Sequence, residues 1–312
     1  MLRMTTTIQK IVDCILLNSC SVNSSGLYNG KAGMALALFE AARFLHDDYI
    51  EEQAFNLLQE ALITKTEDIS FENGLSGIGY VLLYLAHDNF IDADFNDLFG
   101  DQHQKVMMRV GELKGTPNTM LRLNYYLAEV RHQIPDNHQT DKLIRTLFEA
   151  TELDLHSQFS GFNKLTYNND KKSVLSKFEC YMKTVCDCGY KGYSHSLLNE
   201  YANLYRSGYI KSSFTIASYL EMLRLESIFN DVICANKQHA IQSDLLQHCD
   251  LRNLIEFSQL SKNEEIITSI TSENESEKAI LNHIPMEALT AGYEHGLSRL
   301  LIYLTNKKTI LS

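Results

Sequence analysis

The sequence contains no tryptophan and only 3 prolines in 312 residues. Because proline breaks helix interiors and removes hydrogen bonds from strands, its scarcity favours long uninterrupted helices. The lack of tryptophan counts against a sugar-acting enzyme, which would place tryptophan platforms beside its paired catalytic carboxylates. No stretch of 18 apolar residues occurs, so we expect no membrane span.

The sequence also has fewer basic than acidic residues. It contains 28 Lys and Arg residues and 39 Asp and Glu residues, which gives a net charge of −11. An acidic surface argues against a nucleic-acid partner and against an anionic membrane. The first twenty residues have no continuous apolar segment of the signal-peptide kind, and the 7 cysteines are irregularly spaced. We therefore expect reduced thiols and a cytoplasmic location.

Strand patterns are nearly absent, whereas helical spacing runs through the chain. Residues 8–16, 50–62 and 214–225 carry apolar stripes that predict amphipathic helices with one buried face. Three further stretches are apolar on most sides and predict helices that are buried on most sides: residues 32–45, 75–86 and 297–304. Residues 263–278 are the most polar stretch and predict a surface loop or an exposed helix.

Three segments repeat one pattern: LYNGKAGMALAL, FENGLSGIGYVLL and YEHGLSRLLIYL. They align without gaps, which places Asn29-Gly30, Asn73-Gly74 and His295-Gly296 in register. Four weaker copies are expected to start near Pro117, Leu155, Tyr193 and Gln238.

The repeats predict an all-α fold in a single domain over residues 1–312, with about seven inner and about seven outer helices. An open solenoid and a closed α/α toroid both stack such units. The terminal copies are apolar and resemble each other, which favours closure, with the first and last units packed together.

At these motifs the sequence resembles the lanthionine synthetase C-like (LanC-like) family, the cyclases of lanthipeptide biosynthesis. The resemblance is carried by GLYNGKAGMALALF from Gly26, NGLSGIGYVLLYL from Asn73 and GYEHGLSRLLIYL from Gly292. It implies an α/α toroid of seven units that adds the cysteine thiols of a precursor peptide to dehydroalanine or dehydrobutyrine. It also implies one zinc ion held by two cysteines and one histidine, and a dehydratase or another peptide-modifying enzyme as partner.

The sequence departs from the family pattern at the expected zinc ligands. Ser194 and Gln238 stand where the fifth and sixth units would supply cysteine, and no Cys-His-Gly triplet occurs. We therefore expect no zinc in the family geometry. This leaves two functions open: a thioether-forming cyclase, or a zinc-free subunit that binds or presents a peptide to a partner enzyme.

Four histidines recur at one repeat position, and imidazole exchanges protons near neutral pH. His156 matches the family's fourth-unit histidine at the start of an inner helix, so the catalytic candidates are His156, His195 and His239. Helix capping is the alternative role for each of them. A rim of the glycine loops is the candidate peptide-binding surface, formed by Tyr28, Asn29, Asn73, Tyr293 and His295. Its two tyrosines also fit a packing role.

A second candidate set of metal ligands consists of Cys186, Cys188 and His195. Its spacing differs from the Cys-x2-4-Cys pattern of standard zinc sites. Ordinary thiols at a helix end are the preferred interpretation.

Overall fold

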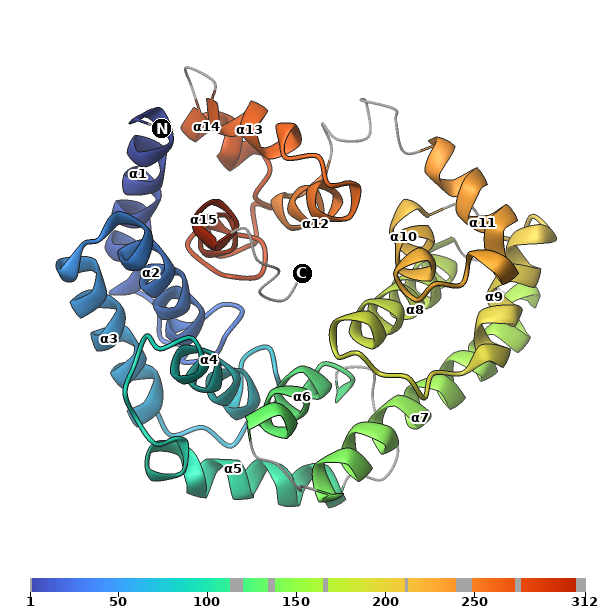
Figure 1. Ribbon diagram of the computed structural model, residues 1–312, viewed down its shortest axis with the longest axis horizontal. Helices are drawn as coiled ribbons and strands as arrows, with labels where there is room; N and C mark the ends of the chain where they lie inside the picture. Colours follow the sequence, from blue (N-terminus) through green and yellow to red (C-terminus); the bar gives the residue numbers. More distant parts are fainter. Residues whose placement is uncertain are drawn as a thin grey trace. The chain divides into compact units, whose positions relative to one another are not determined.

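The computed structural model describes residues 2–112, 120–133, 138–164, 168–210, 213–239, 249–272 and 276–306. These residues form α-helices, one short 3₁₀ helix and connecting loops, with no strand among them (Figure 1). The all-α prediction is therefore confirmed for the described chain.

The helices in its first half are α1 (Leu2–Ser19), α2 (Lys31–Leu45), α3 (Asp48–Ile63), α4 (Leu75–His87), α5 (Phe95–Glu112), α6 (Leu123–Gln133) and α7 (His138–Gly161). The second half contains η2 (Phe162–Lys164), α8 (Asn168–Asp187), α9 (His195–Arg206), α10 (Phe214–Met222), α11 (Glu226–His239), α12 (Leu251–Ser261), α13 (Glu265–Ser272), α14 (Ser276–Asn282) and α15 (Leu297–Asn306). None of these helices combines the length and the apolarity needed to cross a membrane.

The chain divides into two compact units. Unit 1 consists of residues 1–109 and 244–312, and unit 2 consists of residues 110–243, so α5 runs from one into the other. A single domain over residues 1–312 stays a prediction.

Unit 1 is built around α2, which is buried on nearly all sides from Ala32 to Ala42. The helix packs against α1, α3, α4 and α15, and Figure 1 shows α15 beside it. The apolar stretches at residues 32–45, 75–86 and 297–304 form α2, α4 and α15 as predicted. The contact between α2 and α15 confirms that the first and last repeats pack together.

The three glycine repeats share a backbone hydrogen-bond pattern, which confirms their register. The first N–H of each helix donates to the carbonyl seven residues earlier, and these bonds are Lys31 to Ser24 (3.0 Å), Leu75 to Asp68 (2.8 Å) and Leu297 to Thr290 (2.7 Å). The loops are also joined to one another, since Glu294 N–H donates to the Tyr28 carbonyl and Tyr28 N–H donates to the Glu72 carbonyl.

Glycine is required where these loops approach the helix that follows. A Cβ atom on Gly33 would lie 1.9 Å from the carbonyl oxygen of Leu27, and one on Gly77 would lie 2.2 Å from that of Phe71. The third repeat has Arg299 at this position, and its Nε donates to the Tyr293 carbonyl (3.0 Å). The equivalent carbonyl therefore lies against a glycine in the first two repeats, whereas in the third it accepts a hydrogen bond from an arginine side chain.

Unit 2 contains α6 to α11, with α7 packed against α6, α8 and α9. Its core is aromatic: the rings of Phe178 and Tyr201 are stacked with centroids 4.6 Å apart, and Phe159 packs edge-on against Phe178. The prediction that an inner helix starts near Leu155 is wrong, because this residue lies inside the 24-residue helix α7. Leu143, Leu147, Leu155 and Phe159 continue one buried stripe past that point, so the helix has no reason to break.

Candidate functional site

The best-connected polar cluster among the predicted residues surrounds His156 in unit 2. His156 lies near the C-terminal end of α7 and is partly exposed. Its Nδ1 atom lies 2.9 Å from Oε2 of Glu200 on α9. Its Nε2 atom lies 3.2 Å from the hydroxyl oxygen of Ser194 and 3.4 Å from that of Ser196.

Ser194 is held in this cluster by the start of α9. As the N-cap residue, its hydroxyl oxygen accepts the Leu197 N–H, and its own N–H donates to Oε1 of Glu152. The Tyr181 hydroxyl donates to the same carboxylate oxygen (2.5 Å). Helices α7, α8 and α9 therefore meet at one hydrogen-bonded group.

The electrostatics of the cluster differ between its two carboxylates. Burial raises the pKa of Glu152, and the hydrogen bonds from Tyr181 and Ser194 work in the opposite direction. Burial also raises the pKa of the Tyr181 hydroxyl, which therefore stays a donor at neutral pH. Glu200 faces the imidazole ring directly and is more exposed than Glu152.

The arrangement is suited to general-base chemistry. With Nδ1 close to the Glu200 carboxylate, Nε2 faces the two serine hydroxyls at the partly exposed start of α9. A carboxylate behind imidazole also stabilises the imidazolium that forms when Nε2 takes a proton. Nε2 could therefore accept a proton from a serine hydroxyl or from an incoming thiol.

The other two predicted catalytic histidines are not placed in this cluster. His195 is the first residue of α9 and is exposed, with its ring 5.2 Å from that of Tyr193. His239 ends α11, and its side chain lies outside the described residues.

Two of the five residues in the predicted peptide-binding rim are buried, and the other three are not. Tyr28 and Tyr293 are 5% and 1% exposed, and the centroids of their rings lie 6.1 Å apart. They join the glycine loops, so the packing role holds for them, and a peptide would have no access to either ring. Asn29, Asn73 and His295 remain exposed or partly exposed.

Two polar residues of this rim, Asn29 and His295, lie in a group of charged side chains in unit 1. Glu294 accepts a hydrogen bond from Asn29 (3.2 Å) and lies 3.7 Å from Nη1 of Arg252. His295 lies between two carboxylates, with Nδ1 3.5 Å from Asp250 and Nε2 3.6 Å from Glu294. The charged groups of this cluster are thus Arg252 and the two carboxylates, Asp250 and Glu294.

The zinc ion that the LanC-like resemblance implies would require cysteine ligands. Ser194, at an expected cysteine position, offers a hydroxyl that caps α9. Over the ranges that the structure describes, no three His, Cys, Asp or Glu side chains are arranged to hold a metal. Burial raises the pKa of Cys186 to about 12 and that of Cys188 well above its ordinary value, so without a metal both are neutral thiols at pH 7.

The comparison with protein families agrees with the motif at the first two repeats. Residues 21–98 match the family described as Lanthionine synthetase C-like protein. The segment includes α2, α3 and α4 with the two glycine loops before α2 and α4, so the resemblance predicted from these loops is confirmed. The chain carries a LanC-like segment in unit 1. No curated protein matches the chain.

Sequence reasoning missed Glu200, Glu152 and Tyr181. One signal was available, because Glu200 follows Ser196 by four residues and so lies on the same face of a helix. Its pairing with His156 joins residues 44 positions apart on different helices, which helical periodicity does not reveal.

Proposed function

We propose that this protein acts in the maturation of a ribosomally made precursor peptide, in the cytoplasm and together with a dehydratase or another modifying enzyme. The LanC-like match of residues 21–98 is the observation that carries this proposal. The chemistry that such a peptide offers is a cysteine thiol beside a dehydroalanine or dehydrobutyrine.

In the proposed reaction, His156 takes the thiol proton on Nε2 and Glu200 orients the ring through Nδ1. The thiolate sulfur bonds to the β-carbon of the dehydro residue, and the α-carbon then takes back a proton. All atoms of the peptide are retained in the thioether ring.

The expected rate is low. A free cysteine thiol has a pKa near 8.5, so only a small share is thiolate at neutral pH. General-base assistance contributes about 10²- to 10⁴-fold. This route needs no metal, in keeping with the serine at position 194.

The alternative is a subunit that binds or presents the peptide without catalysis. Ser194, which stands in place of an expected zinc-ligand cysteine and serves as a helix cap, favours this alternative. Both functions require binding of the precursor peptide, and they differ in whether thiols are consumed.

A thiol-consumption assay separates the two. A dehydrated peptide with free cysteines is incubated with the protein, alkylated and analysed by mass spectrometry. For the cyclase, His156→Ala lowers the rate of thiol loss by about a hundredfold or more, and Glu200→Gln lowers it by less. His132→Ala, an exposed histidine elsewhere in unit 2, is the matched control and leaves the rate unchanged. If the parent protein binds the peptide without consuming thiols, and His156→Ala binds it equally well, the scaffold is established. A peptide that does not bind contradicts both.

A further inference from the structure

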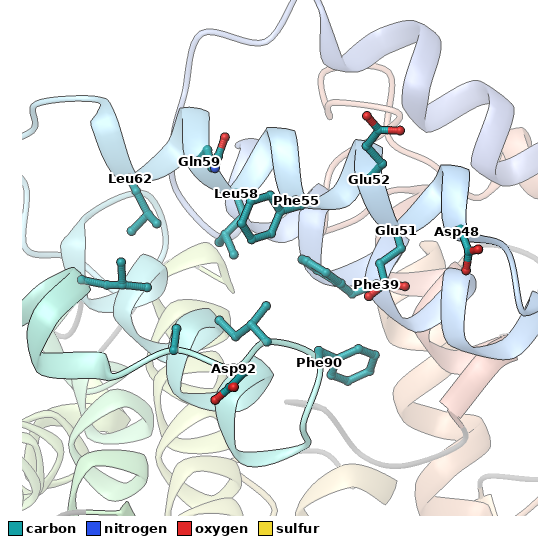
Figure 2. Close-up of a pocket in the computed structure, with 13 residues that line it drawn as sticks. Phe39, Asp48, Glu51, Glu52, Phe55, Leu58, Gln59, Leu62, Phe90 and Asp92 are labelled. Atoms are coloured by element: carbon teal, nitrogen blue, oxygen red, sulfur yellow. The ribbon is translucent and has the colours of Figure 1, made fainter.

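A groove with an apolar floor lies in unit 1, between α3 and the segment that follows α4. Its volume is about 570 Å³, within the range of small-ligand pockets. Figure 2 shows α3 along one side and the segment with Phe90 and Asp92 along the other. Phe39, Phe55 and Leu58 lie in the space between them.

The groove keeps large apolar surface in contact with water. Phe55 on α3 and Leu98 on α5 are each 45% exposed, and both line the groove. Exposed apolar side chains that gather around a concave surface mark interaction sites, whereas single exposed ones need no explanation.

The charged residues that line the groove are all acidic. Asp48, Glu51, Glu52 and Asp92 line it, and none of its lining residues is Lys or Arg. No ion pair within the described chain involves any of these four carboxylates, whereas Glu60 on the same helix pairs with Lys31. Asp48 and Glu51 favour the first turn of α3 through the helix dipole. Glu52 and Asp92 lie outside that turn, so helix formation does not account for the whole set.

An arginine side chain lies over one aromatic ring of the groove. The guanidinium carbon of Arg43 lies 3.3 Å from the centre of the Phe90 ring, and this arginine also donates to the Asp88 carbonyl. The ring faces here attract positive charge as the carboxylates do.

We propose that this groove binds a cationic amphipathic peptide segment. Its apolar side chains pack on the exposed Phe55 and Leu98, and its Lys or Arg side chains pair with the unmatched carboxylates. Anchors three and four residues apart on one helix face suit such a groove. A second copy of this chain is a poor occupant, because each copy carries a net charge of −11. The proposal does not depend on thiol chemistry.

Binding is measured by fluorescence anisotropy with labelled synthetic helical peptides of about 14 residues. The probe repeats Leu and Lys so that leucines fall on one face. One comparison peptide replaces Lys with Glu, and the other replaces Leu with Ser and keeps the positive charge. We expect the Leu/Lys peptide to bind at least tenfold more tightly than either, and its affinity to fall as salt is added.

Variants test where the peptide binds. The double charge reversal E51K/E52K and the single change Phe55→Ser should each weaken the Leu/Lys peptide by about tenfold or more. The matched control is E265K/E287K, which changes the net charge equally at exposed positions of unit 1 outside the groove. It should weaken binding by less than threefold. Circular dichroism checks that each variant is folded.

Three results would overturn the proposal. E265K/E287K could weaken binding as much as E51K/E52K, which would show that the peptide is attracted by the net charge of the protein and not by the groove. The Ser/Lys peptide could bind as tightly as the Leu/Lys peptide. Sedimentation could also reveal a dimer that Phe55→Ser dissociates, which would make the groove an interface between copies of the chain.

Discussion

Replacing Gly33 with alanine tests the loop packing at the centre of unit 1. The new Cβ would lie 1.9 Å from the Leu27 carbonyl oxygen and 2.9 Å from Cβ of Tyr293. Because the first obstacle is backbone, relief requires movement of the loop that also carries Tyr28. This loop joins the first repeat to the second and to the last.

The expected loss follows from two opposing effects. Overpacking a core costs about 1–3 kcal/mol, and a backbone obstacle favours the upper end. Alanine gains at most about 1 kcal/mol over glycine as a helix former. The net expectation for Gly33→Ala is a loss of about 2 kcal/mol. In a unit of this size that lowers the Tm by about 4–8 °C.

Gly100→Ala is the matched control. Gly100 lies inside α5, where the nearest atom to a new Cβ would be 3.9 Å away. The same substitution should therefore stabilise the protein by about 0.5–1 kcal/mol. Thermal melts and urea unfolding followed by circular dichroism compare both variants with the parent. A Gly33→Ala protein as stable as the parent would refute the close packing of the loops.

Three further predictions concern the ends of the chain, its pH response and its metal content. Deleting residues 292–312 removes α15 and should unfold unit 1 cooperatively in circular dichroism melts, whereas a stable, folded product would indicate an open solenoid. Burial raises the pKa of Glu40, which accepts hydrogen bonds from Tyr84 and Asn306. Between pH 4.5 and the folded-state pKa, the Glu40 carboxyl is therefore ionised in the unfolded chain and still protonated in the folded one. The free energy of unfolding falls as the pH rises through this interval. Glu40→Gln should therefore gain stability relative to the parent over that interval in urea titrations, and parallel pH curves would contradict this. Elemental analysis should find no stoichiometric zinc; one tightly held zinc per chain would contradict the prediction, and loss of that zinc in Cys188→Ser would place it on that segment.

The sequence determined the helices and the repeat register of unit 1. The apolar stretch predicted at residues 32–45 corresponds to α2 at Lys31–Leu45, and the Asn-Gly and His-Gly pairs occupy equivalent loop positions. Both results follow from local rules, because helical periodicity and the steric need for glycine are encoded within a few residues. The polar stretch at residues 263–278 likewise contains the largely exposed helix α13.

Tertiary structure alone decided which polar groups meet. The sequence placed His156 at the start of an inner helix, but it lies within α7, and its carboxylate partner Glu200 comes from α9. The buried state of Tyr28 and Tyr293 likewise depends on contacts between loops 265 residues apart. Periodicity specifies which face of a helix is buried, whereas packing between helices selects the side chains that face each other. The LanC-like motif could therefore be predicted from the sequence, whereas the His156 cluster and the acidic groove could not.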